Sequence, residues 1–162
     1  MHQLIRLTTA DLQSWLAQKL PVFGADWWQK HVVDRLSFQQ QRMVAEKRLQ
    51  SLTDLDFAAL LRVLDQNWHE LTIQYNLARE ARNWIKEMQS VRNKWSHMAA
   101  QDLPPSERYR DADTLERMLD IIDGSSPTRQ AVANFKQEAL AALAPKEIAA
   151  PSAATPTPPP TE

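Results

Sequence analysis

The amino-acid sequence predicts an all-α helical bundle of about five to seven helices. Apolar residues recur at steps of three and four along most of the chain, and no segment alternates strictly between apolar and polar residues. Steps of three and four place side chains on one stripe of an α-helix. Only two of the 162 residues are glycine, too few for the turns of a many-stranded sandwich or for a glycine-rich phosphate loop.

Residues 1–50 are expected to form a Trp-rich helical extension. The pattern Thr8-x-x-Asp11 resembles a capping box and predicts the start of a first helix, which Pro21 ends. Trp27 and Trp28 follow as neighbours, and adjacent positions of a helix cannot share a face. We therefore expect one of them in the core and the other at an interface.

Residues 51–124 are expected to form the helical core of the domain. Their apolar spacing predicts two long helices, over about residues 54–75 and 77–100, and a third over about residues 105–123 after a double proline. The stripes include Trp68, Trp84 and Trp95, which core packing explains better than base stacking does. Gly124 follows the third helix, where a helix end favours a left-handed residue.

The C-terminal part divides into an accessory helix and a proline-rich tail. Within residues 125–143, Ser126 and Pro127 predict the N-cap and first position of an Ala-rich helix over residues 127–143. Residues 144–162 contain six of the ten prolines and only one large apolar residue. This composition predicts a disordered tail or, equally well, a linker to further domains or partner proteins.

Composition excludes several classes of function. The chain has no cysteine, which removes disulfides, thiol nucleophiles and cysteine-ligated metals. No two histidines have the i, i+4 spacing of a helical metal site, so we expect neither a metal nor another cofactor. The balance of 19 basic and 20 acidic residues argues against a DNA-coating protein. Because no apolar run approaches the ~20 residues of a membrane span and the N-terminus has no export signal, we expect no membrane segment and a cytoplasmic location.

The segment from Val91 to Met98 carries the candidate chemistry. Its apolar residues belong to the buried stripe, which leaves Arg92, Asn93, Ser96 and His97 on the neighbouring flank. A histidine transfers protons near neutral pH, and an arginine binds phosphate. With the 2′-hydroxyl of RNA as nucleophile, such a set needs no metal. Arg92 and His97 are about 140° apart around an ideal helix, so they converge only in a groove, at a helix distortion or across a two-fold axis. The alternative is a solvated helix flank without chemistry.

Local charge favours an anionic partner on this helix. Residues 76–98 contain five basic and two acidic side chains, whereas residues 99–123 contain three basic and seven acidic ones. RNA phosphate would be attracted to the first segment, and the second could pair with it in cis or across a dimer. We accordingly assign RNA binding to Lys86, Lys94 and Ser96.

The residues from Arg92 to His97 resemble the R-x(4–6)-H motif of the HEPN superfamily, including its polar residue after the arginine. Three longer stretches resemble the Swt-type HEPN domain, which occurs beside PIN nucleases and, in bacteria, at the N-terminus of large ATPase or helicase-like defence proteins. They are LDFAALLRVLDQNWHEL, REARNWIKEMQSVRNKWSHM and YRDADTLERMLDII. The resemblance covers roughly residues 50–124.

This resemblance implies a helical bundle that is commonly a homodimer, with two motifs lining a shared cleft. Active members are metal-independent endoribonucleases, often in defence systems, and by motif position Arg92 and His97 would be the catalytic pair with Asn93 in support. Many HEPN domains are not catalytic and serve RNA binding or assembly. Two hypotheses follow: an endoribonuclease or RNA-binding module of a larger protein, or an assembly domain whose R-x4-H face is a protein interface.

Overall fold

A computed structural model describes residues 1–98 and 103–144 of the chain. Within these residues all regular secondary structure is helical, which confirms the predicted fold class. Short 3-10 or π turns separate some of the helices. The seven α-helices are α1 (His2–Lys19), α2 (Phe38–Lys47), α3 (Phe57–Gln66), α4 (Trp68–Tyr75), α5 (Arg82–His97), α6 (Pro105–Ile121) and α7 (Ser126–Leu143).

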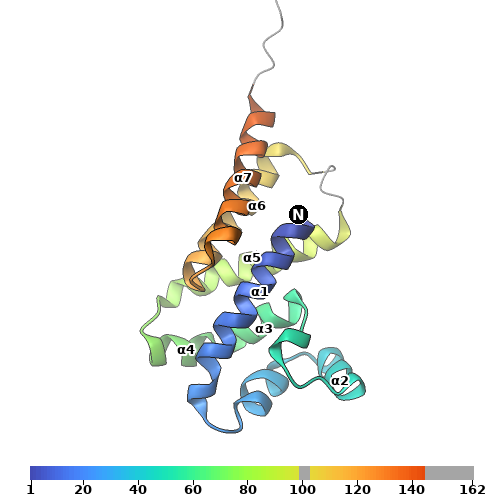
Figure 1. The fold of residues 1–162 in the computed structure, drawn as a ribbon, viewed down its shortest axis with the longest axis vertical. Helices are drawn as coiled ribbons and strands as arrows, with labels where there is room; N and C mark the ends of the chain where they lie inside the picture. The colour runs from blue at the N-terminus through green and yellow to red at the C-terminus, as the bar shows by residue number, and fades with distance from the viewer. Residues whose placement is uncertain (99–102, 145–162) are drawn as a thin grey trace, which may run out of the picture.

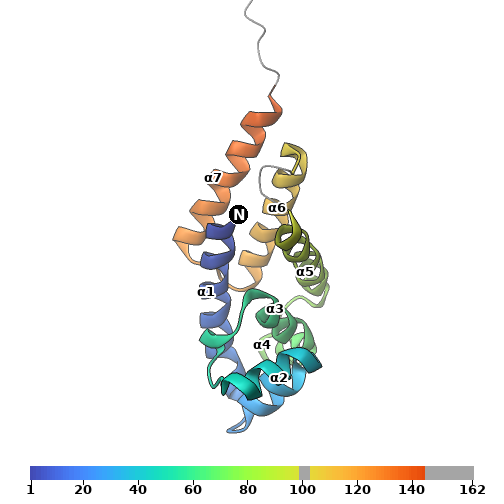
Figure 2. The ribbon, with the colours of Figure 1, turned by 90° about the vertical axis from the view of Figure 1, so that its right-hand side faces the viewer.

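The helices share one core. Helices α6 and α7 form an antiparallel hairpin, α5 packs against both α6 and α3, and α1 packs against α3 and α7 (Figures 1 and 2). Helices α2 and α4 lie at the end of the molecule away from the α6–α7 hairpin. A single hydrophobic cluster runs from Leu4 in α1 to Val132 in α7. Residues 1–50 therefore share their core with residues 51–124.

The first helix begins earlier than the capping pattern predicts. Helix α1 starts at His2, so Thr8 lies inside it, fully buried and without a hydrogen bond for its hydroxyl. The reason is that Leu4 is itself buried and extends the apolar stripe towards the N-terminus. Asp11 does not cap α1; its carboxylate accepts hydrogen bonds from the backbone N–H and the hydroxyl of Ser125, the N-cap residue of α7.

The helix predicted over residues 54–75 is two helices. Helix α3 is capped by Asp56, whose carboxylate accepts from the N–H of Ala59, and ends before Asn67. The Asn67 side chain is fully buried and donates to the carbonyls of Val63 and His31, while its oxygen lies 2.8 Å from His31 Nδ1. These hydrogen bonds hold the side chain of Asn67 where the helix is interrupted, between Gln66 and Trp68. The apolar spacing continues through this interruption, so the sequence pattern did not predict it.

The remaining helix boundaries are close to those predicted. The helix predicted over residues 77–100 is a 3-10 turn, η5 (Arg79–Ala81), followed by α5; residues 99–100 of that prediction lie outside the described part of the chain. The third helix ends at Ile121, and α7 begins one residue before its predicted start. Of the predicted disordered tail or linker, residues 145–162 lie outside the described part.

The aromatic residues follow the prediction only in part. Trp68 and Trp95 are buried, but Trp84 is half-buried and lies under the guanidinium of Arg117 at 4.3 Å from its ring centroid. Trp27 and Trp28 are both half-buried and pack edge to face at 6.1 Å. The expectation that one of this pair lies in the core is wrong, because both rings pack against the margin of the core. That the other lies at an interface stays a prediction.

The turn between α6 and α7 depends on a glycine for a reason other than the predicted one. Asp123, and not Gly124, has the left-handed backbone, with a φ of 52°. The N–H of Gly124 donates to the carbonyl of Leu119 at 2.8 Å, so the chain passes directly over that side chain. A Cβ at position 124 would lie 2.6 Å from Leu119 Cδ2, which leaves no room for a side chain.

Separate substitutions of Gly124 and Asp123 test this explanation of the turn. We expect Gly124→Ala to lower the free energy of unfolding by about 1–3 kcal/mol, because the methyl group overpacks against Leu119. Asp123→Gly should instead leave it unchanged or raise it by less than about 1 kcal/mol, because glycine adopts a left-handed backbone without strain. Urea unfolding of the two variants measures both effects, and a larger loss in Asp123→Gly would contradict the assignment.

A buried carboxylate joins α3 to α5. Asp65 is 2% exposed and accepts hydrogen bonds from Arg82 Nε at 2.8 Å and Lys86 Nζ at 2.6 Å. Burial alone would raise the pKa of Asp65, but the hydrogen bonds and positive charges of Arg82 and Lys86 outweigh it and hold that pKa below its ordinary value of 3.8. A folded-state pKa below the unfolded one stabilises the fold above the unfolded pKa, and this contribution is lost as the pH falls through the folded pKa.

Replacing this carboxylate should therefore change stability in a pH-dependent way. We expect Asp65→Asn to lower the free energy of unfolding by about 1–3 kcal/mol at pH 7, since two charge-assisted hydrogen bonds are lost. The difference from the wild type should shrink as the pH falls below about 4, because the carboxylate of the unfolded chain is protonated there while that of native Asp65 is protonated only at lower pH. Urea unfolding between pH 2.5 and 7, at roughly unit steps, measures this. Glu138→Gln, at an exposed position on α7 without an ion pair in the described residues, is the control; an equal pH dependence in both variants would contradict the role of Asp65.

Candidate functional site

Helix α5 presents the candidate residues because its opposite stripe is buried. Ile85, Met88, Val91 and Trp95 are each at most 5% exposed and face the core. The rotation of the helix is fixed further by the indole N–H of Trp95, which donates to Asp111 Oδ2 in α6 at 2.7 Å. With this stripe inside, the polar residues between Arg92 and His97 lie at the surface or its margin.

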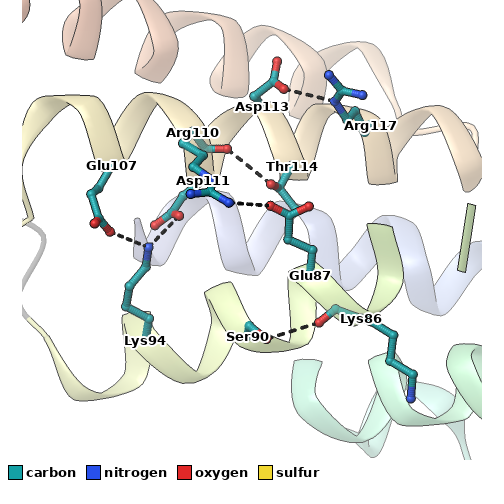
Figure 3. A network of polar contacts seen from close by, with 10 residues as sticks. All are labelled: Lys86, Glu87, Ser90, Lys94, Glu107, Arg110, Asp111, Asp113, Thr114 and Arg117. Carbon is teal, nitrogen blue, oxygen red and sulfur yellow. Dashed lines mark hydrogen bonds and ion pairs between the residues drawn. The ribbon is translucent and has the colours of Figure 1, made fainter. Parts of the chain in front are cut away.

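Lys94 belongs to the contact between α5 and α6. Its Nζ lies 2.7 Å from Asp111 Oδ1 and 2.9 Å from Glu107 Oε2 (Figure 3). Burial lowers the pKa of Lys94, but the hydrogen bonds to the two carboxylates outweigh it and raise the pKa above its ordinary value. The hydrogen bond that Lys94 donates to Glu107 also lowers the pKa of Glu107. The acidic segment after α5 thus pairs with the basic one in cis, one of the two arrangements that the charge pattern allows.

Lys86 and Lys94, both assigned to RNA binding from the sequence, are each in ion pairs. Lys86 pairs with the buried carboxylate of Asp65 and keeps a side chain that is 54% exposed. Lys94 is 29% exposed between two carboxylates of α6. The charge of Lys94 is therefore neutralised within the chain, whereas Lys86 shares the one carboxylate of Asp65 with Arg82, which leaves that group one net positive charge. Of the five basic residues in the 76–98 segment, only Arg79 and Arg92 have no ion pair within the described residues.

Arg92 lies on the wall of a polar pocket. Its side chain is half-buried, and its one hydrogen bond in the described residues is a long contact of 3.4 Å to Asn93 Oδ1. The pocket has a volume of about 270 Å³ and lies between α5, α3 and the start of α2. No acidic residue lines it. The lining residues are Ser37, Gln40, Ala58, Leu61, Arg62, Gln89, Arg92 and Asn93.

Ser96 and His97 lie beyond this pocket. The hydroxyl of Ser96 donates to the carbonyl of Arg92 at 2.9 Å, one turn earlier in the helix. His97 is the last residue of α5, is exposed and does not line the pocket. Because α5 is a continuous α-helix from Arg82 to His97, Arg92 and His97 stay about 140° apart around its axis. The structure brings Arg92 and Asn93 together in one pocket and leaves His97 apart from them.

The pocket contains residues that the sequence did not single out. Ser37, Gln40, Arg62 and Gln89 come from three helices or their caps, and only the tertiary fold brings them to Arg92. One local signal existed: Arg62 is the only charged residue in the apolar run AALLRVL of α3. A cation in the middle of such a run indicates that the position lies at the margin of the core.

Residues 1–98 and 103–144 offer neither a cluster of metal ligands nor a membrane-spanning helix. These residues contain no group of three or more histidine, aspartate or glutamate side chains placed to hold a metal ion. None of the helices described is both long enough and apolar enough to cross a membrane.

Comparison with protein families gives one match. The family described as Swt1-like HEPN matches residues 3–123, from the start of α1 to the end of α6. Comparisons with curated proteins and with solved structures found no significant match. The matched region begins almost fifty residues before the stretch that carries the resemblance in the sequence, and it includes both the Trp-rich segment and the R-x4-H motif. Since the match covers well over half of the chain, the protein belongs to the Swt1-like HEPN family.

Proposed function

We propose that this domain binds RNA at the Arg92 face of α5 and cleaves it without a metal ion. The proposal rests on the burial and the surroundings of Arg92 in a chain of the HEPN family. It is a half-buried guanidinium without an ion pair in the described residues, in a pocket lined by no carboxylate. A guanidinium in this setting favours a phosphate, which accepts its N–H groups in pairs. Asn93 adds a neutral donor on the same wall.

The proposed reaction uses the RNA's own nucleophile. The 2′-hydroxyl oxygen attacks the adjacent phosphorus and the bond from phosphorus to the 5′ oxygen breaks, which leaves a 2′,3′-cyclic phosphate and a 5′-hydroxyl. One base accepts the proton of the 2′-hydroxyl, and one acid donates a proton to the 5′ oxygen. His97 suits either transfer because imidazole exchanges protons near neutral pH. Arg92 would offset the charge that develops on the phosphate oxygens.

The geometry of α5 supports a site shared by two copies. Arg92 and His97 diverge on one continuous helix, so one chain does not place both against the same phosphate. A two-fold axis near the end of α5 would bring the His97 of one copy towards the Arg92 of the other. We therefore propose that the active form is a homodimer.

Alanine substitutions test the assigned pair. Incubated with single-stranded and structured RNA in chelator, the wild type should cleave at a rate unaffected by EDTA. We expect His97→Ala to lower kcat by about 10²–10⁴ and Arg92→Ala by about 10²–10³. His69→Ala, at an exposed histidine of α4, and Arg79→Ala, at an exposed arginine without an ion pair in the described residues, are the matched controls and should cleave at the wild-type rate.

Two outcomes would overturn this assignment. Full activity in both variants, with unchanged circular dichroism, would remove Arg92 and His97 from the reaction. The other outcome is that the wild type neither binds nor cuts RNA, while light scattering shows a dimeric wild type and monomeric Arg92→Ala and His97→Ala variants. In that case the R-x4-H face is a protein interface and the domain serves assembly.

Mixing the two inactive variants tests the shared site. If each site combines Arg92 of one copy with His97 of the other, a dimer of one Arg92→Ala and one His97→Ala chain contains one intact site. Half of the dimers in an equimolar refolded mixture are of this kind, so we expect about a quarter of the wild-type activity to return. A mixture as inactive as its components would place both residues of one site in the same chain.

A further inference from the structure

We propose that the polar pocket beside Arg92 binds a backbone phosphate of the RNA next to the scissile one, and that Arg62 is the residue that contacts it. We call it the Arg62 pocket and define it by the lining residues given above. The inference rests on the proposed function, because it assigns to RNA a surface that adjoins Arg92. It adds to the site a residue of α3 that lies thirty positions before the R-x4-H motif.

The first argument is the way Arg62 is held. Its Nε donates to the backbone carbonyl of Arg35 at 2.9 Å, which orients the guanidinium, while the two terminal nitrogens have no partner in the described residues. Arg35 is itself fixed, since it donates to the carbonyl of Gln66 at 2.7 Å and pairs with Glu70 at 2.8 Å. Arg62 is thus positioned by a neutral acceptor that leaves its charge uncompensated.

The second argument is a contrast with other cations of the fold. Among the other half-buried cations, Arg35, Lys94, Arg129 and Lys136 each lie within 3.1 Å of a carboxylate oxygen. Lys19 lies instead over the rings of Trp15 and Tyr75, and Arg108 has no ion pair in the described residues. Arg62 and Arg92 are half-buried as well, and they share a pocket that no carboxylate lines. Partly desolvated guanidinium groups of like charge repel one another unless an anion lies between them.

The third argument is the character of the remaining wall. Gln89 and Asn93 carry amide N–H groups without an acceptor in the described residues, and Ser37 contributes a hydroxyl. Neutral donors beside a pair of arginines suit a phosphodiester, which has acceptors and a single negative charge. The volume of about 270 Å³ accommodates a phosphate with part of its ribose but not a folded protein segment. Because Arg92 belongs both to the motif and to the pocket, this phosphate would be adjacent to the one cleaved.

Binding of an uncleavable RNA tests the pocket apart from catalysis. The probe is a fluorescent single-stranded RNA with 2′-O-methyl groups throughout, measured by anisotropy at several salt concentrations. We expect Arg62→Gln to weaken binding about ten- to hundredfold, as for a lost charge-assisted hydrogen bond, and to reduce the salt dependence by about 0.7 per phosphate contact. Arg79→Gln, which removes an exposed, unpaired charge just before the N-terminal end of α5, is the matched control and should change neither. With cleavable RNA, the loss should raise KM and leave kcat nearly unchanged.

A second variant tests the pocket even if Arg62→Gln does not fold. Arg62→Gln also loses the bond to the Arg35 carbonyl, whereas Gln89→Glu is nearly isosteric and places a carboxylate among the arginines. We expect it to weaken RNA binding as much as Arg62→Gln does. Wild-type affinity in Gln89→Glu and in a folded Arg62→Gln, with weakened binding in Arg92→Ala, would reject the pocket and leave the proposed function standing. Absence of RNA binding in the wild type would reject both.

Discussion

The orientation of α5 depends on two buried carboxylates, one on each side of the helix. Asp65 of α3 and Asp111 of α6 are each 2% exposed, and each accepts hydrogen bonds from two α5 side chains. A carboxylate buried to this extent is stable only when its partners are well placed, so both contacts strongly favour one rotation of α5. This rotation determines which side chains between Arg92 and His97 are exposed to solvent.

These contacts also divide the basic residues of the helix into two groups. Arg82, Lys86 and Lys94 neutralise the buried carboxylates and join α5 to its neighbours. Arg92 faces the pocket that contains Arg62 and has no carboxylate near it there. A net positive charge summed over the segment therefore overstates the surface available to RNA. Of the two basic residues of the 76–98 segment without an ion pair in the described residues, Arg92 lies where the family motif places its arginine.

The sequence predicts the helices and their buried stripes because these depend on local spacing. Leu12, Leu61, Met88 and Leu119 all lie in the core where their periodicity puts them. The errors arise where a distant residue decides the local structure. Asn67 ends α3 through contacts with His31, thirty-six positions away, and Gly124 is needed because of the side chain of Leu119 rather than its own φ.

The candidate site was predictable to a similar extent. The motif identifies Arg92, Asn93 and His97 from six consecutive residues, and the family match supports their context. What spacing cannot show is which lysines form ion pairs, since Lys86 pairs across twenty-one positions and Lys94 across seventeen. Nor can it show the wall opposite Arg92, because Ser37 and Arg62 reach that wall through the packing of α2 and α3 against α5.

The continuity of α5 links the proposed chemistry to assembly. A helix that is continuous from Arg82 to His97 keeps the two motif residues on different faces, whatever the surrounding side chains do. Under the proposed function, a single chain can hold RNA through Arg92 and the Arg62 pocket, but it gains the proton-transfer group only when a second copy arrives. RNA binding would then be a property of the fold and cleavage a property of the dimer. Control of dimer formation by concentration would then control the activity without any change in the site itself.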